Sequence, residues 1–134
     1  MARFGSWERD LLGNDSYWSP SAYEVFGFPP AAQPPEFEVF EARIHPADRA
    51  RVLEAMARCV TTGELFEVEH RMLAADGTTE KILFARGHRE LDAAGTPSRL
   101  IGIVVDVTES RRLKDSLQQA EQRWQWAVTA SPDG

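Results

Sequence analysis

The chain has 134 residues, 43% of them apolar and four of them tryptophan, which suits one compact domain with a sizeable core and excludes intrinsic disorder. Its formal net charge of −6, without a long run of lysine or arginine, argues against nucleic-acid binding. The single cysteine, Cys59, excludes an intrachain disulfide and favours a reducing cytoplasmic location, and no apolar stretch is long enough for us to expect this segment to contact a membrane.

Two short strands and a short helix are expected at the beginning of the chain. Residues 4–12 and 16–18 have strand character on either side of a glycine-containing turn. Ser19 is then expected to cap a helix that starts at Pro20, because serine is a favoured N-cap and proline a favoured first helical residue. The helix should end at Gly27, the residue type that most often follows a helix.

The next segment predicts a loop and two further helices. Residues 29–35 contain four prolines and no periodicity, which indicates a loop that runs over the surface or covers something. Apolar residues at one-turn spacing predict a short helix over residues 37–44, which ends because Pro46 disfavours helical geometry in the residue before it. A longer helix over residues 47–61 follows, with Gly63 as its terminator.

Three strands are expected after the helices, because the apolar period changes to two. They cover residues 66–72, 79–90 and 100–107, and Asp76-Gly77 is a strong hairpin signal between the first two. Gly102 in the last strand indicates either a close backbone approach or an inward cavity, since a glycine there otherwise only weakens the sheet.

The inward faces of these strands and the helices before them form a candidate ligand pocket. His70 and Arg86 are polar residues at positions that otherwise alternate with apolar ones, and a polar group inside a sheet face needs a partner. Either the two side chains lie near strand ends with their tips in water, or they line the pocket. The candidate lining residues are Phe40, Met56, Val68, His70, Met72, Ile82, Phe84, Arg86 and Val104.

The last segment predicts a helix from residue 109 to about 130, with Thr108 as its N-cap. Twenty-two residues at about 1.5 Å each span about 33 Å, more than a helix needs to cap its own sheet, so we expect part of it to project. Its apolar stripe of about two heptads fits either a parallel homodimer or a helix docked on its own domain. The stripe consists of Leu113, Leu117, Ala120, Trp124 and Ala127.

Several local strings stand in a fixed order along the chain: Gly5-Ser6-Trp7-Glu8, Trp18-Ser19-Pro20 with Phe26-Gly27, His45-Pro46-Ala47-Asp48-Arg49, Glu69-His70-Arg71, Asp76-Gly77 and Asp106-Val107-Thr108-Glu109. With the order of elements, they resemble the most common bacterial subfamily of the PAS domains over about residues 4–110. The resemblance implies an α+β fold with a five-stranded antiparallel sheet, helices on one face and a C-terminal exit helix. It also implies that Asp106 and Thr108 couple the last strand to that helix.

The resemblance further implies a fragment of a multidomain bacterial signalling protein. We expect residues 1–110 to form the sensory domain and residues 111–123 a helical signalling linker. Residues 124–134 look like the start of a further, truncated PAS repeat. By resemblance, such modules precede histidine kinase, diguanylate cyclase or phosphodiesterase domains. The repeat is suggested by Glu121-Gln122-Arg123-Trp124 with Ala127 and Ser131-Pro132-Asp133-Gly134.

We expect neither a catalytic nor a metal site in this segment. His45, His70 and His88 lack the local spacing of metal ligands. By resemblance, heme-binding members ligate iron with a histidine of the longer helix, which has none here, and flavin-binding members carry a reactive cysteine early in that helix, whereas Cys59 lies near its end in an apolar stripe. We therefore argue against heme and flavin, and the cofactor, if any, is unknown.

Two functions remain after this reading, because no nucleophile, base or metal set for an enzyme is present. The first is a sensory module that binds a small ligand or a partner and transmits a conformational signal through its C-terminal helix. The alternative is a ligand-free dimerisation spacer. The string around Asp48 looks structural in either case, since proline fixes a helix start and an acidic residue complements the helix dipole there.

Overall fold

The computed structural model describes residues 3–74 and 76–130. Five strands form one sheet in the order β2-β1-β5-β4-β3, and every neighbouring pair is antiparallel. The elements are β1 (Phe4–Asp10), β2 (Tyr17–Trp18), α1 (Pro20–Phe26), α2 (Phe37–Arg43), α3 (Pro46–Thr62), β3 (Phe66–Leu73), β4 (Glu80–Leu91), β5 (Pro97–Asp106) and α4 (Thr108–Ala130).

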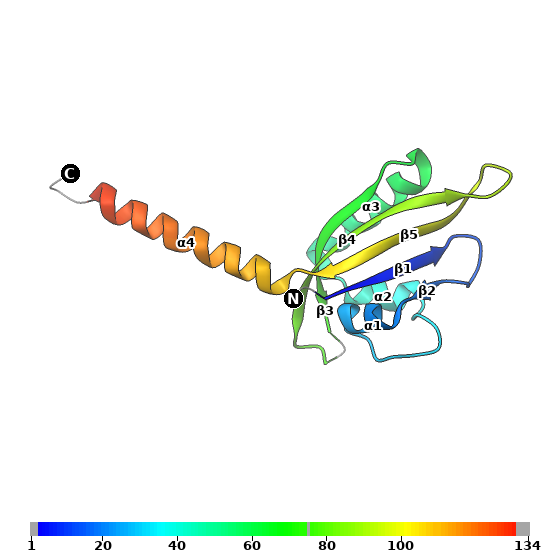
Figure 1. Ribbon diagram of the computed structural model, residues 1–134, viewed down its shortest axis with the longest axis horizontal. Coiled ribbons are helices and arrows are strands. Elements are labelled where there is room, and N and C mark those ends of the chain that lie inside the picture. The colour runs from blue at the N-terminus through cyan, green and yellow to red at the C-terminus, as the bar shows by residue number, and fades with distance from the viewer. Residues whose placement is uncertain (1–2, 75, 131–134) are drawn as a thin grey trace.

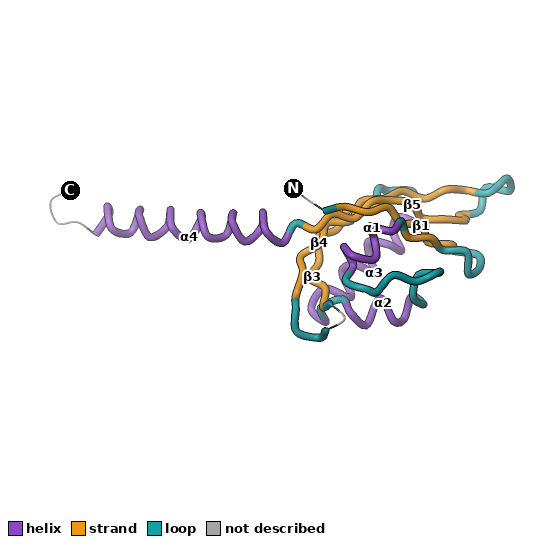
Figure 2. The backbone as a smooth tube through the Cα atoms, turned by 60° about the horizontal axis from the view of Figure 1, so that its bottom comes forward, coloured by secondary structure: helices purple, strands orange, loops and turns teal. Residues whose placement is uncertain are grey.

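Helices α1, α2 and α3 lie on one face of the sheet, and α4 projects from one end of it (Figures 1 and 2). The α+β class, the five-stranded antiparallel sheet and the projecting exit helix are thus confirmed. Gly27 and Gly63 end α1 and α3 in the left-handed conformation, as predicted, with φ of 82° and 79°. The string from Ser131 to Gly134, on which the expected further repeat partly depends, lies outside the described residues.

Ser19 is the N-cap residue of α1 and Pro20 begins the helix, as predicted, but the Ser19 side chain makes no capping hydrogen bond. Its hydroxyl accepts the backbone N–H of Ser6 at 2.9 Å, and its own N–H donates to the Ser6 carbonyl at 2.9 Å. The residue therefore joins the start of α1 to β1, because the strand offers a second set of backbone groups at this point.

The close approach expected at Gly102 is made by Trp7. A Cβ at Gly102 would lie 2.0 Å from the Arg86 carbonyl oxygen and 2.6 Å from the indole of Trp7, and one at Gly87 would lie 2.9 Å from the same indole. The ring also donates from Nε1 to the Ile103 carbonyl at 3.0 Å. A tryptophan of β1 therefore packs across one glycine of β5 and one of β4. Any other residue at these two positions would bring a Cβ into contact with the indole.

The inward face was predicted correctly for β3 and wrongly for β4. Val68, His70 and Met72 are buried toward the helices, as expected. Val68 pairs with Ala85, so β4 turns Leu83, Ala85 and Gly87 inward. The correction has a physical reason: β4 is apolar on both faces at its centre, so alternation alone does not distinguish them. The three residues expected inward that lie on the outer face are Ile82, Phe84 and Arg86.

Asp48 fastens α3 to β3. Its carboxylate accepts the backbone N–H of Arg71 at 2.8 Å and two guanidinium N–H groups of the same residue at 3.0 and 2.9 Å. These hydrogen bonds from Arg71 hold the pKa of Asp48 well below its ordinary value, although burial opposes them. The expected structural role of the string around Asp48 is therefore supported, with a clamp between two elements added to the helix-dipole effect.

Candidate functional site

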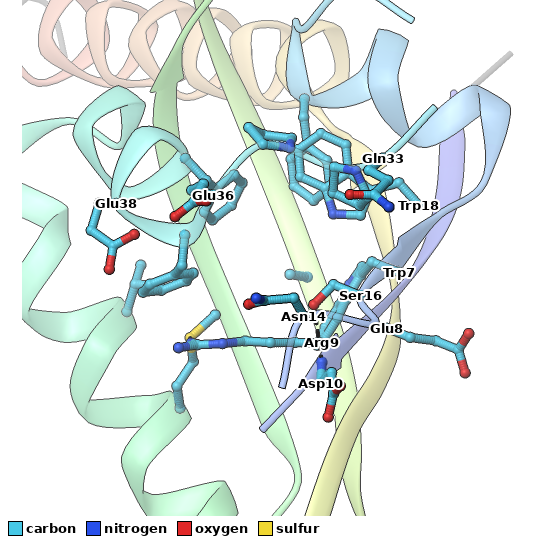
Figure 3. Close-up of a pocket in the computed structure, with 18 of the residues that line it drawn as sticks. Trp7, Glu8, Arg9, Asp10, Asn14, Ser16, Trp18, Gln33, Glu36 and Glu38 are labelled. Atoms are coloured by element: carbon cyan, nitrogen blue, oxygen red, sulfur yellow. Dashed lines mark hydrogen bonds between the residues drawn. The ribbon is translucent and has the colours of Figure 1, made fainter. Parts of the chain in front are cut away.

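A cavity of about 410 Å³ lies between the sheet and the helices. Its wall comes from β1, the β1–β2 turn, β2, the proline-rich loop, α2, α3 and the inward faces of β3 and β4 (Figure 3). The expectation that the proline-rich loop covers something is thereby met. The lining residues on which the argument depends are Trp7, Arg9, Trp18, Phe37, Phe40, Met56 and His70.

One wall of the cavity is a cluster of aromatic rings. Trp18 packs against Phe26 with ring centroids 4.5 Å apart, and Phe26 packs edge-on against Phe40 at 5.0 Å. Phe37 approaches Phe40 at 6.0 Å. Such mutually packed rings offer an apolar surface whose shape is set before any ligand arrives.

Arg9 brings a positive charge to this apolar surface. Its side chain extends from β1 across the cavity toward α3, where a guanidinium N–H reaches the thioether of Met56 at 3.4 Å (Figure 3). The guanidinium carbon lies 3.6 Å from the centroid of the Phe37 ring. Burial lowers the pKa of Arg9, while the charges of Glu38 and Glu41 act in the opposite direction.

His70 contributes a buried imidazole from β3. The side chain is 3% exposed, and its Nδ1 lies 3.4 Å from the Arg71 carbonyl oxygen. Burial lowers the pKa of His70, which favours the neutral ring at neutral pH. A neutral imidazole can donate from one nitrogen and accept at the other, so it suits a polar uncharged group of a ligand.

The structure places part of the predicted pocket set at this cavity. Phe40, Met56 and His70 line it, and His70 is buried there and does not have its tip in water. Arg86 lies on the outer face, where its guanidinium pairs with Glu67 at 3.0 Å. Val68, Met72 and Val104 are buried in the core but are not among the lining residues, and Ile82 and Phe84 are on the other face of the sheet.

Sequence reasoning missed the contribution of β1 and of the turn after it. Arg9, Asn14 and Ser16 line the cavity, and so do Trp7 and Trp18. The available signal was an arginine two residues after Trp7, on the same face of the first strand. Its direction could not be read because Trp7, Glu8, Arg9 and Asp10 do not alternate cleanly between polar and apolar.

The root of α4 is bound to β4. Thr108 is the first residue of the helix, and its hydroxyl accepts the backbone N–H of Ile82 at 2.9 Å instead of capping the helix as expected. Asp106 accepts the backbone N–H of Thr108 at 3.0 Å and its hydroxyl at 2.5 Å. Val107 completes the attachment by donating to the Ile82 carbonyl at 2.9 Å.

Beyond this root, α4 leaves its apolar stripe in water. Leu113, Leu117 and Trp124 are 70%, 67% and 68% exposed. Trp126, which the stripe did not include, is 76% exposed. A further contact with the domain is made in the first turns, where Arg111 pairs with Glu69 of β3 at 3.3 Å. The helix is therefore anchored at one end and uncovered along the rest of its length.

The histidine and cysteine residues do not gather at one point. Across the described part of the chain, no group of three or more His, Cys, Asp or Glu side chains is placed to hold a metal ion. Cys59 is fully buried in the core, and burial raises the pKa of its thiol. Within residues 3–74 and 76–130, no helix combines the length and the apolar character needed to cross a membrane.

Two curated proteins are similar to this chain in sequence. It is 30% identical over 129 residues to the sensor protein FixL of Bradyrhizobium diazoefficiens, a match that covers 96% of the chain and 25% of the relative. It is 29% identical over 119 residues to the probable diguanylate cyclase DgcE of Escherichia coli, covering 89% of the chain and 10% of the relative. The chain thus spans a quarter or less of the length of these relatives.

Solved structures agree with this similarity. A sensory box histidine kinase/response regulator from Burkholderia thailandensis superimposes with a TM-score of 0.75 at 27% identity, over 92% of this chain and 91% of that one. The N-terminal domain of a diguanylate cyclase from Marinobacter aquaeolei has a TM-score of 0.70 at 22% identity over 81% of this chain and 98% of that one, a likeness of fold alone. The family model of the PAS fold matches residues 15–104, and the chain therefore belongs to the PAS family of sensory domains.

Proposed function

We propose that this PAS domain detects a small ligand in its cavity and transmits the change through α4 to an output domain. The observation that carries the proposal is the geometry of α4, which is fixed to the sheet at its root and exposed along its apolar stripe. A change in the sheet therefore has a rigid element to act on, and that element has a surface ready for a second copy.

Strand β3 offers a route from the cavity to both helices. His70 faces the cavity, and its two neighbours in the strand point the other way and hold other elements. Glu69 pairs with Arg111 of α4 at 3.3 Å, and Arg71 binds Asp48 of α3 at 2.9 Å. A ligand that displaces His70 would thus act on the root of α4 and on the start of α3 through the same three residues.

The second connection runs through β4 and β5. Asp106 and Thr108 are proposed to carry a movement of the sheet to α4, because their hydrogen bonds fix the first turn of the helix to Ile82. Lys81 adds a link, since its ammonium donates to the Glu24 carbonyl of α1 at 2.7 Å and lies 4.0 Å from the Asp106 carboxylate. The two connections meet at the same helix start.

In the proposed arrangement, two copies pair in parallel through the stripe of Leu113, Leu117 and Trp124. Residues 111–123 act as the signalling linker, and residues 124–134 begin a further PAS repeat. The output domain is of the diguanylate cyclase, phosphodiesterase or histidine kinase kind. The similarity to DgcE and to the Burkholderia thailandensis histidine kinase supports the first and the last of these. The segment itself carries no catalysis, and the protein works in the cytoplasm.

Sedimentation velocity tests the dimer. Replacing Leu113 and Leu117 together by asparagine should convert a dimer to a folded monomer, because both side chains lie in the stripe that the partner would cover. The matched control replaces Asp115 and Gln119 by asparagine, with the same spacing on the opposite side of α4, and should leave the dimer intact. An unchanged sedimentation coefficient for the first variant, with a folded spectrum, would refute this interface.

A ligand-free dimerisation spacer is the competing function, and the exposed stripe alone would serve it equally well. The cavity of about 410 Å³ favours the sensor, since a spacer gains nothing from an open pocket with a buried imidazole and a guanidinium in its wall. Native mass spectrometry and an absorption scan of the purified chain separate the two. A bound small molecule supports the sensor, and a bare chain that ignores every added ligand supports the spacer.

A further inference from the structure

Arg9 differs from most other arginines of the domain in what it binds. Arg71, Arg86 and Arg111 each reach a carboxylate within 3.3 Å. Arg9 takes part in none of the ion pairs found among the described residues, and its recorded partners are the thioether of Met56 and the face of Phe37. A guanidinium has five N–H donors, and a thioether is a weak acceptor, so most of its donor capacity is available on the cavity side.

The acidic residues around the cavity do not fill this need. Both carboxylate oxygens of Asp10 are taken by backbone N–H groups, from Leu12 and Asp15 at 3.0 Å each. Glu8 extends away from the cavity (Figure 3), and Glu38 and Glu41 act on Arg9 through their charges without an ion pair recorded among the described residues. These charges, with that of Glu36 in the cavity lining, still disfavour a ligand of high negative charge. A ligand with a single negative charge would therefore have to place that charge on the guanidinium.

The remainder of the lining defines the rest of the ligand. Trp7, Trp18, Phe37 and Phe40 give an apolar and aromatic surface next to the guanidinium. A cavity of about 410 Å³ falls in the size range of small-molecule pockets, which limits the ligand to a small molecule. Aromatic rings pack well against such a surface, and a carboxylate matches the planar fork of an arginine.

We infer that the cavity binds a small aromatic monocarboxylate, with its carboxylate on the Arg9 guanidinium and its ring among the aromatic side chains. This inference rests on the proposed sensory function and names the class of ligand for it. It predicts that charge on the ligand and Arg9 on the protein act together, so that removing either one removes the same increment of affinity.

Calorimetric titration with matched pairs of compounds tests the inference. The probes are phenylacetate, 3-phenylpropanoate and indole-3-acetate, each compared with its own primary amide, which keeps the shape and removes the charge. For the unmodified chain, after dialysis to remove small molecules, we expect at least one acid to bind ten-fold or more tightly than its amide. Arg9→Gln should erase that preference, and Arg9→Lys should keep part of it.

Arg86→Gln is the matched control, because Arg86 lies on the outer face of the sheet, and it should leave the preference unchanged. Thermal unfolding of each variant verifies that the domain stays folded. If Arg9→Gln does not fold, Arg9→Lys takes its place in the comparison of acids and amides. Acids and amides that bind equally, or a preference that survives Arg9→Gln, would overturn the carboxylate assignment and leave a ligand-binding sensor standing. Binding of neither set to the unmodified chain would overturn the ligand class, and the native mass spectrum then decides separately whether the chain is a ligand-binding sensor.

Discussion

Helices α3 and α4 carry similar sequence patterns and have opposite environments. Both place apolar residues at steps of three and four, yet Val52 and Cys59 of α3 are fully buried, whereas Leu113 and Leu117 of α4 are about two-thirds exposed. Helix α3 is held along its length, by the Asp48–Arg71 clamp at its start and by Arg89, which donates to the Val60 carbonyl at 2.9 Å, near its end. The contacts found between α4 and the sheet, among the described residues, lie in its first turns.

The difference shows which features of a helix's packing an apolar stripe predicts and which it does not. The spacing tells that one face of a helix needs cover, because exposed apolar surface is unfavourable in water. Whether the cover comes from the same domain depends on polar contacts at both ends of the helix. In α3 those contacts bring the stripe onto the sheet. In α4 the contacts found among the described residues lie in the first turns, and Leu113, Leu117 and Trp124 stay exposed.

The largest expected effect comes from placing an asparagine in the apolar stripe of α3, and the same change in the stripe of α4 should have little effect. Val52→Asn should destabilise the domain by about 3 kcal/mol or more, because it places an unpaired amide in the core at a side chain that is 1% exposed. Leu117→Asn should change the free energy of unfolding of the monomer by less than about 0.5 kcal/mol. Urea unfolding, at protein concentrations too low for dimerisation, measures the free energy of unfolding of both variants. Similar losses for Val52→Asn and Leu117→Asn would contradict the difference between the two helices.

The second prediction concerns the clamp that holds α3. Asp48→Asn should cost about 2 kcal/mol, because it weakens charge-assisted hydrogen bonds to Arg71. Arg71 is 41% exposed, so water screens part of the interaction and the cost stays below that of a fully buried pair.

The clamp also has a signature in acid. Since the pKa of Asp48 is lowered in the folded state, its contribution is present above the unfolded value of about 4 and is lost as the pH falls below it. Unfolding curves from pH 6 to pH 2 should therefore fall less steeply for Asp48→Asn than for the unmodified chain. Parallel curves would show that another carboxylate governs the acid response.

The third prediction weakens the root of α4. Thr108→Val removes the hydroxyl that accepts the Ile82 N–H at 2.9 Å and keeps the branched shape. We expect a loss of about 1 kcal/mol, since a backbone donor is left without its partner. Hydrogen exchange should quicken at Ile82 and in the first turn of α4 and stay unchanged in α3. Equal exchange rates in Thr108→Val and in the unmodified chain would show that the hydroxyl does not hold the helix.

Much of the fold could be predicted from residues that act locally. Gly27 and Gly63 end their helices by adopting positive φ, and Asp76 accepts three hydrogen bonds from Thr78 and Thr79 in the expected hairpin. These features depend on neighbours in the chain. Ser19 holds the predicted N-cap position, but its hydroxyl and that of Thr108 bind strands and not the helix, because a hydroxyl takes whichever backbone donor the tertiary fold brings near.

The candidate site was less accessible from sequence. His70 was found because β3 alternates cleanly, and Arg9 was missed because β1 does not. The wrong inward face of β4 has the same cause, since Ile82, Leu83, Phe84 and Ala85 are apolar in succession. Pairing with β3 fixes which of them face the helices, and that pairing joins residues of two strands across a turn whose exact register the sequence leaves open.

The smallest expected effect tests the ion pair that joins β3 to α4. Glu69 and Arg111 approach to 3.3 Å with side chains that are 35% and 42% exposed, so the pair should contribute about 0.5 kcal/mol. Glu69→Gln and Arg111→Gln should each quicken hydrogen exchange in residues 109–112 slightly, and the double variant should add little to either alone. High salt should remove the difference from the unmodified chain, because it screens exposed charges.

Glu67 provides the control for this ion pair, because it is also a glutamate of β3 in an exposed ion pair and its partner, Arg86, is in β4. Glu67→Gln should leave exchange in α4 unchanged while costing a similar small amount of stability. If both glutamate variants loosen α4 alike, the effect comes from the charge of β3 in general. If neither does, the hydrogen bonds of Asp106, Val107 and Thr108 attach the helix without Glu69, and the route from His70 through Glu69 is lost while the route through β4 and β5 remains.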